Sequence, residues 1–293
     1  MKEKKSRIAE LGLLVTAIIW GSAFVVVKNT TEAVSTNYLL AIRFLIAAVV
    51  LSAIFFKSLK KFDFLYLKNG LILGGLLYFS FYLQTVGIQY TTAGNNAFLT
   101  AVYVVLVPFL YWIVRRQCPK NYQLFAAFVC IIGIGLLSLQ NDFTINIGDL
   151  LSLLCGVAFC AQIVAVSIFT ERQDPILLSI LQFLFSGLFA LIAAVLFEPF
   201  PSQIGTDAVL GLLFLGIFST AIAFGLQTVC QKYTSASKAS LLMSLESFFG
   251  CLSGIIFLHE PVTPKVLAGF GLIFLAILIS ETKLSFLSRK RTA

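Results

Sequence analysis

The sequence predicts an all-α integral membrane protein with ten transmembrane helices in two inverted-topology repeats of five helices. Three observations carry this prediction. The composition is extremely apolar, the apolar runs are about 20 residues long, and part of the sequence returns at a fixed offset of 143 residues. The composition indicates the solvent, the run lengths indicate the secondary structure, and the repeat indicates the topology.

The composition excludes a water-soluble globule. The 293 residues are 59% hydrophobic and only 12% charged, and their mean hydropathy is +0.97. Soluble domains carry about 25% charged residues, so these segments would have no polar face to present to water. Backbone groups inside lipid must satisfy their own hydrogen bonds, which leaves helices or a closed barrel. The apolar runs are about twice as long as the alternating segments of barrels, so we expect helices.

Ten apolar runs are long enough to cross a hydrocarbon core of about 30 Å at about 1.5 Å per residue. They cover residues 8–27, 37–56, 67–88, 93–114, 121–139, 148–169, 176–197, 206–230, 236–258 and 264–282. Short connections rich in breaker residues join them, so no separate soluble domain is expected. The first five-helix repeat is predicted over 8–139 and the second over 148–282, with basic cytoplasmic tails over 1–7 and 283–293.

The repeat is strongest between a stretch that begins at Phe81 and one that begins at Phe224. Eight of thirteen aligned positions are identical, and they include a Gln-Thr and a Tyr-Thr pair. Apolar residues match easily by chance but polar pairs do not, so the match indicates internal duplication. Each half holds an odd number of spans, so the second half must enter the membrane in the opposite direction. Such inverted repeats are common in secondary transporters.

Basic residues predict the orientation. Eighteen of the 21 Lys and Arg residues fall on the side of both termini, and only Lys28 and Lys265 fall on the other side. Basic loops remain in the cytoplasm, so both termini are predicted to be cytoplasmic, in the cell (inner) membrane. This orientation accounts for the net charge of +8 without nucleic acid as a partner. The first apolar run is too long for a signal peptide and lacks a small-residue cleavage site, so it is predicted to be a transmembrane helix.

Enzymatic and cofactor chemistry finds little support in the sequence. The six cysteines show no paired CxxC spacing and mostly lie in apolar segments, so neither a disulfide framework nor a metal site is expected. The chain has one His and no cluster of Asp residues, whereas an integral membrane enzyme usually needs clustered acids or metal ligands. It also lacks a Walker sequence, so ATP is not expected to drive it. We predict no enzyme activity and no cofactor.

Motifs spread over nearly the whole chain carry a family resemblance. They are Trp20-Gly21-Ser22-Ala23-Phe24, Arg43, the block from Tyr90 to Thr100 with Pro108 beyond it, the block from Tyr233 to Ala239, Leu245-Glu246 and His259-Glu260. In their order and spacing they resemble the drug/metabolite transporter superfamily, EamA-like family, ten-helix type. Two positions depart from that pattern. Glu246-Ser247 stands where the family often has Glu-Pro, and His259-Glu260 stands where it often has Gly-Glu. Without the proline, the ninth span is expected to be straighter.

The resemblance implies two inverted halves around a central substrate cavity, and a permease for small metabolites. The expected function is a secondary active transporter or facilitator that works by alternating access, with export of amino acids or related zwitterionic or neutral solutes. Its expected partners are a small-molecule substrate and the lipid bilayer. Protons are a candidate coupling ion, and the sequence is compatible with a homodimer.

Arg43 and Glu246 are the two charged residues placed clearly inside predicted spans. A charge there costs at least a few kcal/mol, so it is normally paired or faces a wet cavity. In a functional interpretation both side chains line the cavity, where Arg43 binds a carboxylate and Glu246 exchanges a proton. In a structural interpretation each anchors helix packing through backbone carbonyls or polar neighbours.

Further polar and aromatic residues are candidates for substrate binding. They are the repeat-related pair Gln84 and Gln227, a stripe of Asn96, Thr100 and Tyr103, a stripe that includes Ser240 and Ser244, and an aromatic wall of Trp20, Tyr78 and Tyr82. Residues three or four apart share a helix face, and a polar face in a spanning helix points to protein or water. Interhelical hydrogen bonds and close packing remain the structural alternative for each of them.

Two other classes of transport protein stay open at this point. A nucleotide-sugar or phosphate-ester exchanger would need a cluster of Arg or Lys residues for the phosphate, and the spans offer only Arg43. A channel is compatible with an inverted repeat, although a receptor is not favoured by it.

Overall fold

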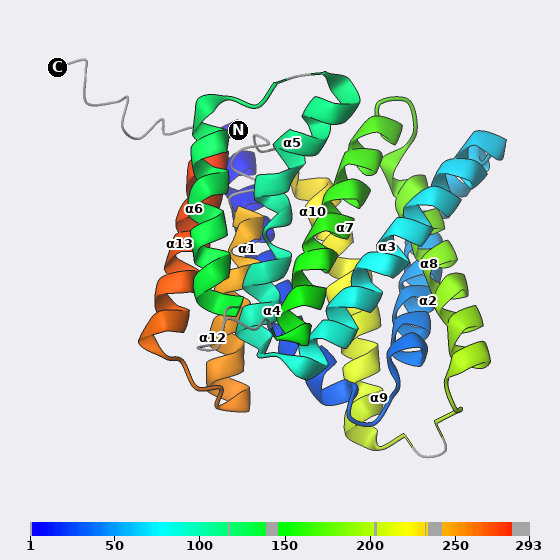
Figure 1. Cartoon of the computed structure of the whole chain (residues 1–293). Coiled ribbons are helices and arrows are strands. Elements are labelled where there is room, and N and C mark those ends of the chain that lie inside the picture. Colours follow the sequence, from blue (N-terminus) through cyan, green and yellow to red (C-terminus); the bar gives the residue numbers. More distant parts are fainter. Residues whose placement is uncertain are drawn as a thin grey trace.

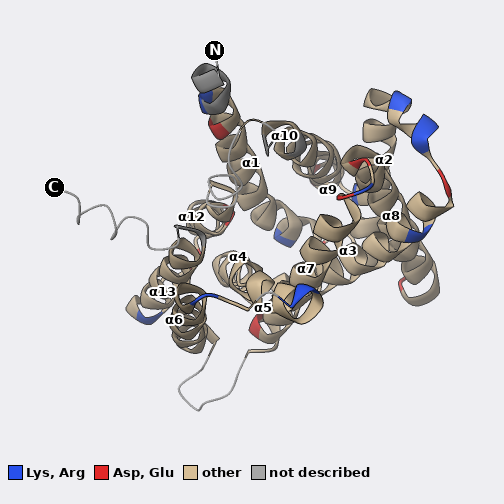
Figure 2. Cartoon of the chain, turned by 90° about the horizontal axis from the view of Figure 1, so that it is seen from above, with Lys and Arg blue, Asp and Glu red and all other residues tan. Residues whose placement is uncertain are grey.

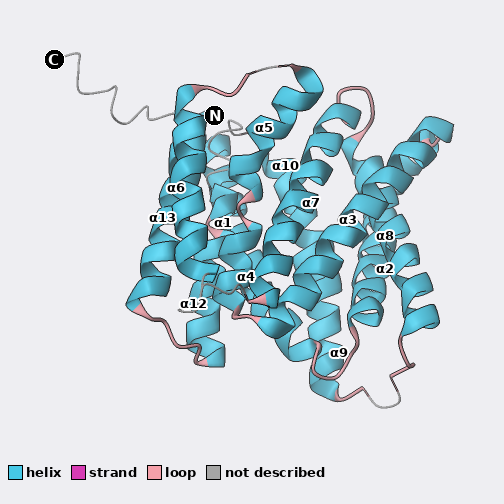
Figure 3. Cartoon of the chain, viewed as in Figure 1, coloured by secondary structure: helices cyan, strands magenta, loops and turns pink. Residues whose placement is uncertain are grey.

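The computed structural model describes residues 2–116, 118–138, 146–201, 204–231, 233 and 242–282. All elements in these ranges are helices, joined by short loops (Figure 3). The first half contains α1 (Lys2–Thr30), α2 (Thr36–Ile54), η1 (Phe56–Lys61), α3 (Phe64–Tyr90), α4 (Ala93–Thr100), α5 (Tyr103–Arg115) and α6 (Asn121–Ser138). The second half contains α7 (Ile147–Phe169), α8 (Pro175–Phe197), α9 (Thr206–Leu213), η2 (Phe214–Ile222), α10 (Ala223–Gln231), α12 (Glu246–Leu258) and α13 (Pro264–Thr282).

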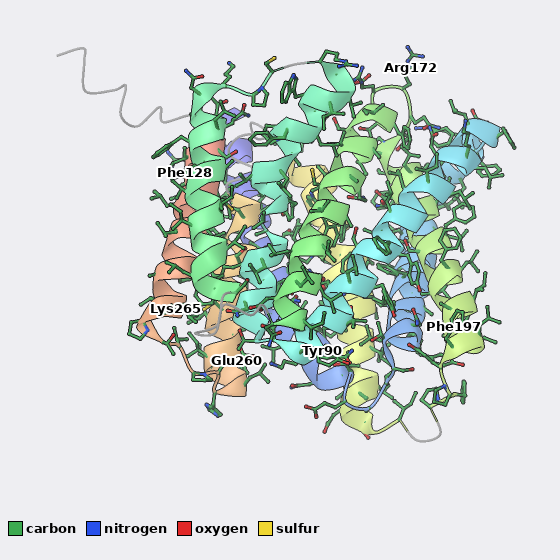
Figure 4. The ribbon with its side chains drawn as sticks, in the orientation of Figure 1. Tyr90, Phe128, Arg172, Phe197, Glu260 and Lys265 are labelled. Carbon is green, nitrogen blue, oxygen red and sulfur yellow. The ribbon has the colours of Figure 1, made fainter. Side chains whose placement is uncertain are left out.

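These helices supply ten spans. Eight are long and apolar enough to cross a membrane, and the shorter apolar helices Leu242–Leu258 and Pro264–Ser280 occupy the places of the ninth and tenth. Large apolar side chains point outward around the bundle, such as Phe128, which is 61% exposed, and Phe197, which is 80% exposed (Figure 4). Exposed apolar surface on this scale suits lipid and not water.

The two ends of the bundle are distinct. We call the end where α1 begins and α13 ends the terminal face; it also carries η1 and the α5–α6 and α7–α8 connections (Figure 1). The other end, which we call the opposite face, carries the α1–α2, α3–α4, α8–α9 and α12–α13 connections. Because α1 begins at the terminal face and α7 begins at the opposite face, the two halves run in opposite directions.

Helix packing follows the repeat. Spans that occupy equivalent places in the two halves contact each other: α2 packs on α8, α6 packs on α13, and the fourth span contacts the ninth through α4 and α12. Viewed from above, the α2–α8 pair and the α6–α13 pair lie on different sides of the bundle (Figure 2). The α3–α7 contact is matched by contacts of α1 with α9, η2 and α10. A pseudo-two-fold axis between inverted halves produces this pattern, in which each contact between two spans has a counterpart between their repeat mates.

Two spans are interrupted at equivalent positions. Val102 lies between α4 and α5 with φ −55° and ψ −22°, and Leu245 precedes α12 with φ −64° and ψ −12°. Their numbers differ by the repeat offset of 143, and each donates its N–H to the carbonyl three residues back, Leu99 or Leu242. Both are therefore single 3₁₀-type turns inside a span. The ninth span is therefore interrupted at Leu245 without the proline, while its expected straightness is not tested by these dihedral angles.

Candidate functional site

A cavity of about 960 Å³ runs between the two halves. It is lined by residues of α1, α2, α3, α4, α5, α7, α8, η2, α10 and α12, so both repeats contribute to it. The aromatic rings of Phe81, Phe159 and Phe224 form much of its apolar wall, and Arg43 and Glu246 are the charged residues in its lining. A mostly apolar cavity with a few convergent polar groups is typical of a small-molecule site.

The cavity differs at its two ends. Toward the terminal face its lining includes Tyr122, Pro175 and Ser179, and Pro175 is exposed. Toward the opposite face the lining ends at Val27 and Ile88, which are only 7% and 1% exposed. Among the described residues, the lining thus reaches the surface at the terminal face and ends in buried residues toward the opposite face.

Arg43 lies on α2 and is buried, with 3% of its surface exposed. Its Nε donates to Thr220 Oγ1 at 2.7 Å, and its NH2 group donates to Ser219 Oγ at 3.2 Å. The guanidinium also lies over the ring of Phe81, 4.5 Å from the centroid. Arg43 is not part of any ion pair within the described ranges. An Arg side chain has five N–H donors, so some of them remain available to a ligand in the cavity.

The partners of Arg43 lie on a nine-residue π-helical segment, η2. Thr220 Oγ1 donates to the carbonyl of Leu215, five residues back, and the Ser219 carbonyl accepts a hydrogen bond from Trp20 Nε1 at 2.9 Å. A π segment widens the helix and is frequent at functional sites. The corresponding part of the first half lies within the regular helix α3, so this feature belongs to the second half alone.

Glu246 begins α12 directly after the interruption at Leu245, and it is 9% exposed. Tyr103 begins α5 directly after the equivalent interruption and donates its hydroxyl to Glu246 Oε1 at 3.1 Å. The two residues are separated by 143 positions, the offset of the repeat. Repeat-related side chains can touch in this way only where the pseudo-two-fold axis passes between them. Glu246 has no basic partner within ion-pair distance among the described residues.

The predicted stripe on the fourth span lies in a polar network at the cavity wall. Asn96 Nδ2 donates to Ser152 Oγ at 2.7 Å and to the Gln84 carbonyl at 3.1 Å. Gln84 Nε2 donates to Thr100 Oγ1 at 3.3 Å, and the Thr100 hydroxyl lies 3.7 Å from Cys155 Sγ. Gln84, Asn96 and Thr100 all line the cavity. They therefore hold α3, α4 and α7 together while presenting polar groups to the cavity.

Of the remaining predicted site residues, some line the cavity and others do not. Trp20 and Gln227 line the cavity, but Tyr78 and Tyr82 do not, which corrects the expectation of an aromatic wall made by all three aromatic residues. The Tyr78 hydroxyl donates to Asn37 Oδ1 at 2.8 Å, so this side chain supports the start of α2 instead. Ser244 is buried outside the cavity lining, and Ser240 lies outside the described residues.

Sequence reasoning missed the groups that close the opposite face. Glu260 Oε1 accepts hydrogen bonds from Lys28 Nζ and from the Ala93 N–H, both at 2.8 Å, and Oε2 accepts one from the Gly94 N–H at 3.4 Å. Lys28 Nζ also donates to the Thr91 carbonyl at 3.0 Å. A carboxylate at a helix N-terminus is stabilised by the free N–H groups and the helix dipole. This cluster, which we call the Glu260 latch, joins α1, α4 and the end of α12.

A second contact closes the same face next to the Glu260 latch. Asp149, at the start of α7, accepts hydrogen bonds from Thr91 Oγ1 at 2.5 Å and from Asn95 Nδ2 at 3.2 Å. Gly148 brings α7 very close to α3, because a Cβ atom there would lie 2.6 Å from the Gly87 carbonyl oxygen. In the sequence, Glu260 stood out only as the acidic residue of His259-Glu260, and Lys28 only as one of two basic residues on this side of the membrane.

His259 positions Glu260 through an unusual backbone conformation. It ends α12 with φ 52° and ψ 36°, in the left-handed region that favours glycine. Arg116, its equivalent at the repeat offset, ends α5 with φ 58° and ψ 26°. The left-handed turn gives a physical reason for a glycine before the glutamate in related sequences, and here histidine occupies that place.

Comparison with known proteins agrees with this architecture. The EamA-like transporter family matches the chain twice, at residues 7–139 and 146–282. This chain belongs to the EamA-like transporter family. An "Uncharacterized transporter" of Archaeoglobus fulgidus is 36% identical over 275 residues, which cover 92% of this chain and 85% of that protein. The "Uncharacterized transporter YoaV" of Bacillus subtilis is 23% identical over 278 residues, covering 92% and 95% of the two chains.

A solved structure described as "Crystal structure of protein" shares the fold, with a TM-score of 0.67 at 17% identity over 96% of this chain and 99% of that chain. The EamA-like transporter is thus an all-α membrane protein with ten spans in two inverted repeats around a central cavity. It belongs to a family of transporters, as the resemblance predicted.

Proposed function

We propose that this EamA-like transporter carries small zwitterionic or neutral metabolites, such as amino acids, by alternating access. The observation that carries this proposal is the large cavity between the inverted repeats, whose described lining reaches the surface at one face and ends near the Glu260 latch at the other. Inverted-repeat transporters expose one site near the midplane to each side in turn by moving one half against the other. In this proposal, the arrangement described here is one of these two states.

Arg43 is the proposed binding site for a substrate carboxylate. Its planar fork of donors fits a carboxylate with two parallel bonds, and its present partners are two neutral hydroxyl groups. Phosphate carries about two charges near neutral pH and is usually bound by several Arg or Lys side chains. Because Arg43 is the one basic residue in the lining among the residues that the structure describes, a nucleotide sugar or phosphate ester is less well matched than a zwitterion.

The proposed location is the cell (inner) membrane with both termini in the cytoplasm. The loops of the terminal face carry most of the basic residues, and basic loops remain cytoplasmic. In this orientation the cavity opens toward the cytoplasm, where a metabolite destined for export would enter. The direction of net flux depends on the concentration gradients. We therefore propose export in the cell, and we expect the purified protein to exchange substrate in both directions.

Counterflow in proteoliposomes tests this function. Vesicles loaded with one unlabelled amino acid at a time should accumulate the same labelled compound transiently if the protein is a carrier. Arg43→Gln should lower exchange of carboxylated substrates by at least tenfold, because it removes a charge-assisted bidentate contact, whereas Arg43→Lys keeps the charge and should lose less. Ohmic currents without counterflow would identify a channel and contradict the proposal.

A further inference from the structure

We propose that Glu246 and Tyr103 form a site for one positive charge at a time, which holds a proton when the cavity is empty and the ammonium group of the substrate when it is occupied. This inference rests on the proposed function and deepens it, because it makes the transporter an exchanger of substrate for protons. The argument depends on the position of the pair, its surroundings and its relation to Arg43.

The position of the pair suits a coupling site. Tyr103 and Glu246 are repeat-related, hydrogen-bonded to each other and part of the cavity lining. A point on the pseudo-two-fold axis keeps its place when the halves exchange conformations, so both faces can reach it in turn. The turns at Val102 and Leu245 immediately precede the two residues. In inverted-repeat transporters, substrate and coupling-ion sites lie at the interface between the repeats, which is where this pair lies.

The surroundings leave Glu246 without a fixed counter-charge. Among the described residues, the titratable groups next to it are Tyr103 from α5, which donates to it, and Cys155 from α7, while Arg43 from α2 lines the same cavity. None of these forms an ion pair with it within the described ranges. An unpaired carboxylate inside a membrane protein is costly, so binding either a proton or an ammonium group would remove that cost. A carboxylate that already carries a proton is neutral, so it no longer attracts an ammonium group. The proton and the ammonium group therefore compete for Glu246.

Arg43 and Glu246 supply one basic and one acidic group to the lining of the same cavity. The guanidinium would hold the substrate carboxylate, and the Glu246 carboxylate would hold the ammonium group. When the ammonium group arrives, the carboxyl O–H bond of Glu246 breaks and its proton leaves to water at the open face. The substrate keeps all of its own protons, and no other bond is made or broken. Each exchange of a zwitterion for a proton therefore moves one net positive charge across the membrane.

The test compares two transport modes in the same proteoliposomes. A labelled amino acid that shows counterflow is offered to vesicles with an acidic interior, while valinomycin and equal potassium hold the membrane voltage at zero. A difference of one pH unit should then drive up to about tenfold accumulation if one proton leaves for each substrate that enters. Glu246→Gln should abolish this accumulation and retain counterflow, with weaker substrate binding. Tyr103→Phe, which removes the donor to the carboxylate, should lower pH-driven accumulation several-fold and retain counterflow.

Ser247→Ala provides the matched control. Ser247 is the buried neighbour of Glu246 and does not line the cavity, so this variant should behave like the wild type in both modes. Retained counterflow shows that each variant is folded and active. Counterflow without pH-driven accumulation in the wild type, or full pH-driven accumulation in Glu246→Gln, would overturn the coupling site while leaving the carrier function intact. Absence of counterflow in the wild type for every amino acid would overturn both.

Discussion

The two faces of the transporter hold their helices together in different ways. At the opposite face, Lys28 and Glu260 pair next to the N-terminus of α4, and their side chains are 28% and 10% exposed. At the terminal face, the Arg115–Glu171 and Lys61–Asp174 pairs lie at the rim, and Glu171 and Lys61 are 55% and 58% exposed. Exposed ion pairs contribute little to stability, whereas a half-buried carboxylate on a helix N-terminus can contribute more. The more stabilising contacts between helices thus lie at the closed end of the cavity.

The repeat makes this difference more informative. The first spans of the two halves align at an offset of 139 residues, which places Lys28 on Ser167, and the offset of 143 places Glu260 on Gln117, so neither charge of the latch is repeated at the matching position of the other half. A symmetric transporter would close either face equally well. Here the charges favour closure of the opposite face, so the state with the cavity open at the terminal face should be the preferred state without substrate.

Glu260→Gln should have the largest effect on this preference. It keeps the size of the side chain but removes the charge that holds Lys28 and the start of α4. We expect the ratio of the two states to shift on the order of tenfold, which corresponds to about 1.4 kcal/mol. The readout is the labelling rate of Val27→Cys, on a cysteine-free background, by an impermeant reagent applied at the opposite face. Glu171→Gln, which removes an exposed pair at the terminal face, is the control and should leave this rate unchanged.

Gly148→Ala should disturb helix packing at the opposite face through a steric clash. The added methyl would meet the Gly87 carbonyl at 2.6 Å, so α3 and α7 would have to separate at the opposite face. Overpacking of this kind costs about 1–3 kcal/mol. A lower apparent melting temperature in detergent is expected. Gly271→Ala is the matched control, since a Cβ atom at this helical glycine meets nothing within 4 Å. An unchanged melting temperature for Gly148→Ala would contradict the tight contact between these helices.

His259→Gly should stabilise the protein by a smaller amount. Glycine adopts the left-handed conformation of this position without steric cost, and the expected gain is about 1 kcal/mol. His259→Ala separates this effect from loss of the imidazole, because alanine keeps the backbone strain and should not stabilise. Arg116→Gly at the equivalent position should act in the same direction. A melting temperature that falls in both glycine variants would mean that the histidine and arginine side chains matter more than the backbone.

The smallest effect is expected at the exposed Lys61–Asp174 pair. Burial alone would raise the pKa of Asp174, but the hydrogen bond and charge of Lys61 and the N–H groups of Ile176 and Leu177 outweigh it and lower that pKa. The contribution of Asp174 to stability is therefore complete above its ordinary pKa and is lost as the pH falls through the lowered value. Lys61→Met should leave the melting temperature at neutral pH nearly unchanged. A large drop at neutral pH would show that exposed pairs at the terminal face matter as much as the Glu260 latch.

Much of the fold followed from the sequence because lipid imposes simple constraints. Run length and composition predicted all ten spans, and the polar matches between Gln84 and Gln227 revealed the duplication. Arg43 and Glu246 were identified because charge is rare and costly in a membrane, and both line the cavity.

The missed features arise from packing between the halves, which one sequence does not display. Nothing in the composition of η2 indicates a π segment, and the turn at Leu245 lacks the proline that would have signalled it. The contact of Tyr103 with Glu246 requires the pseudo-two-fold axis, whose position the repeat alone does not give. Tyr78 was assigned to the cavity from its aromatic character, but its hydroxyl is bound to Asn37 at the start of α2.

Accessibility of one cavity from both faces tests the central claim most directly. Single cysteines in a cysteine-free background at Ser179, near the terminal-face opening, and at Val27, near the closed end, report on the two entrances. In oriented vesicles without substrate, an impermeant maleimide should label Ser179→Cys from the terminal face and leave Val27→Cys unlabelled from the opposite face. A transported amino acid should increase labelling of Val27→Cys from the opposite face and decrease labelling of Ser179→Cys. Simultaneous labelling at both positions, unaffected by substrate, would indicate a continuous pore and would contradict alternating access.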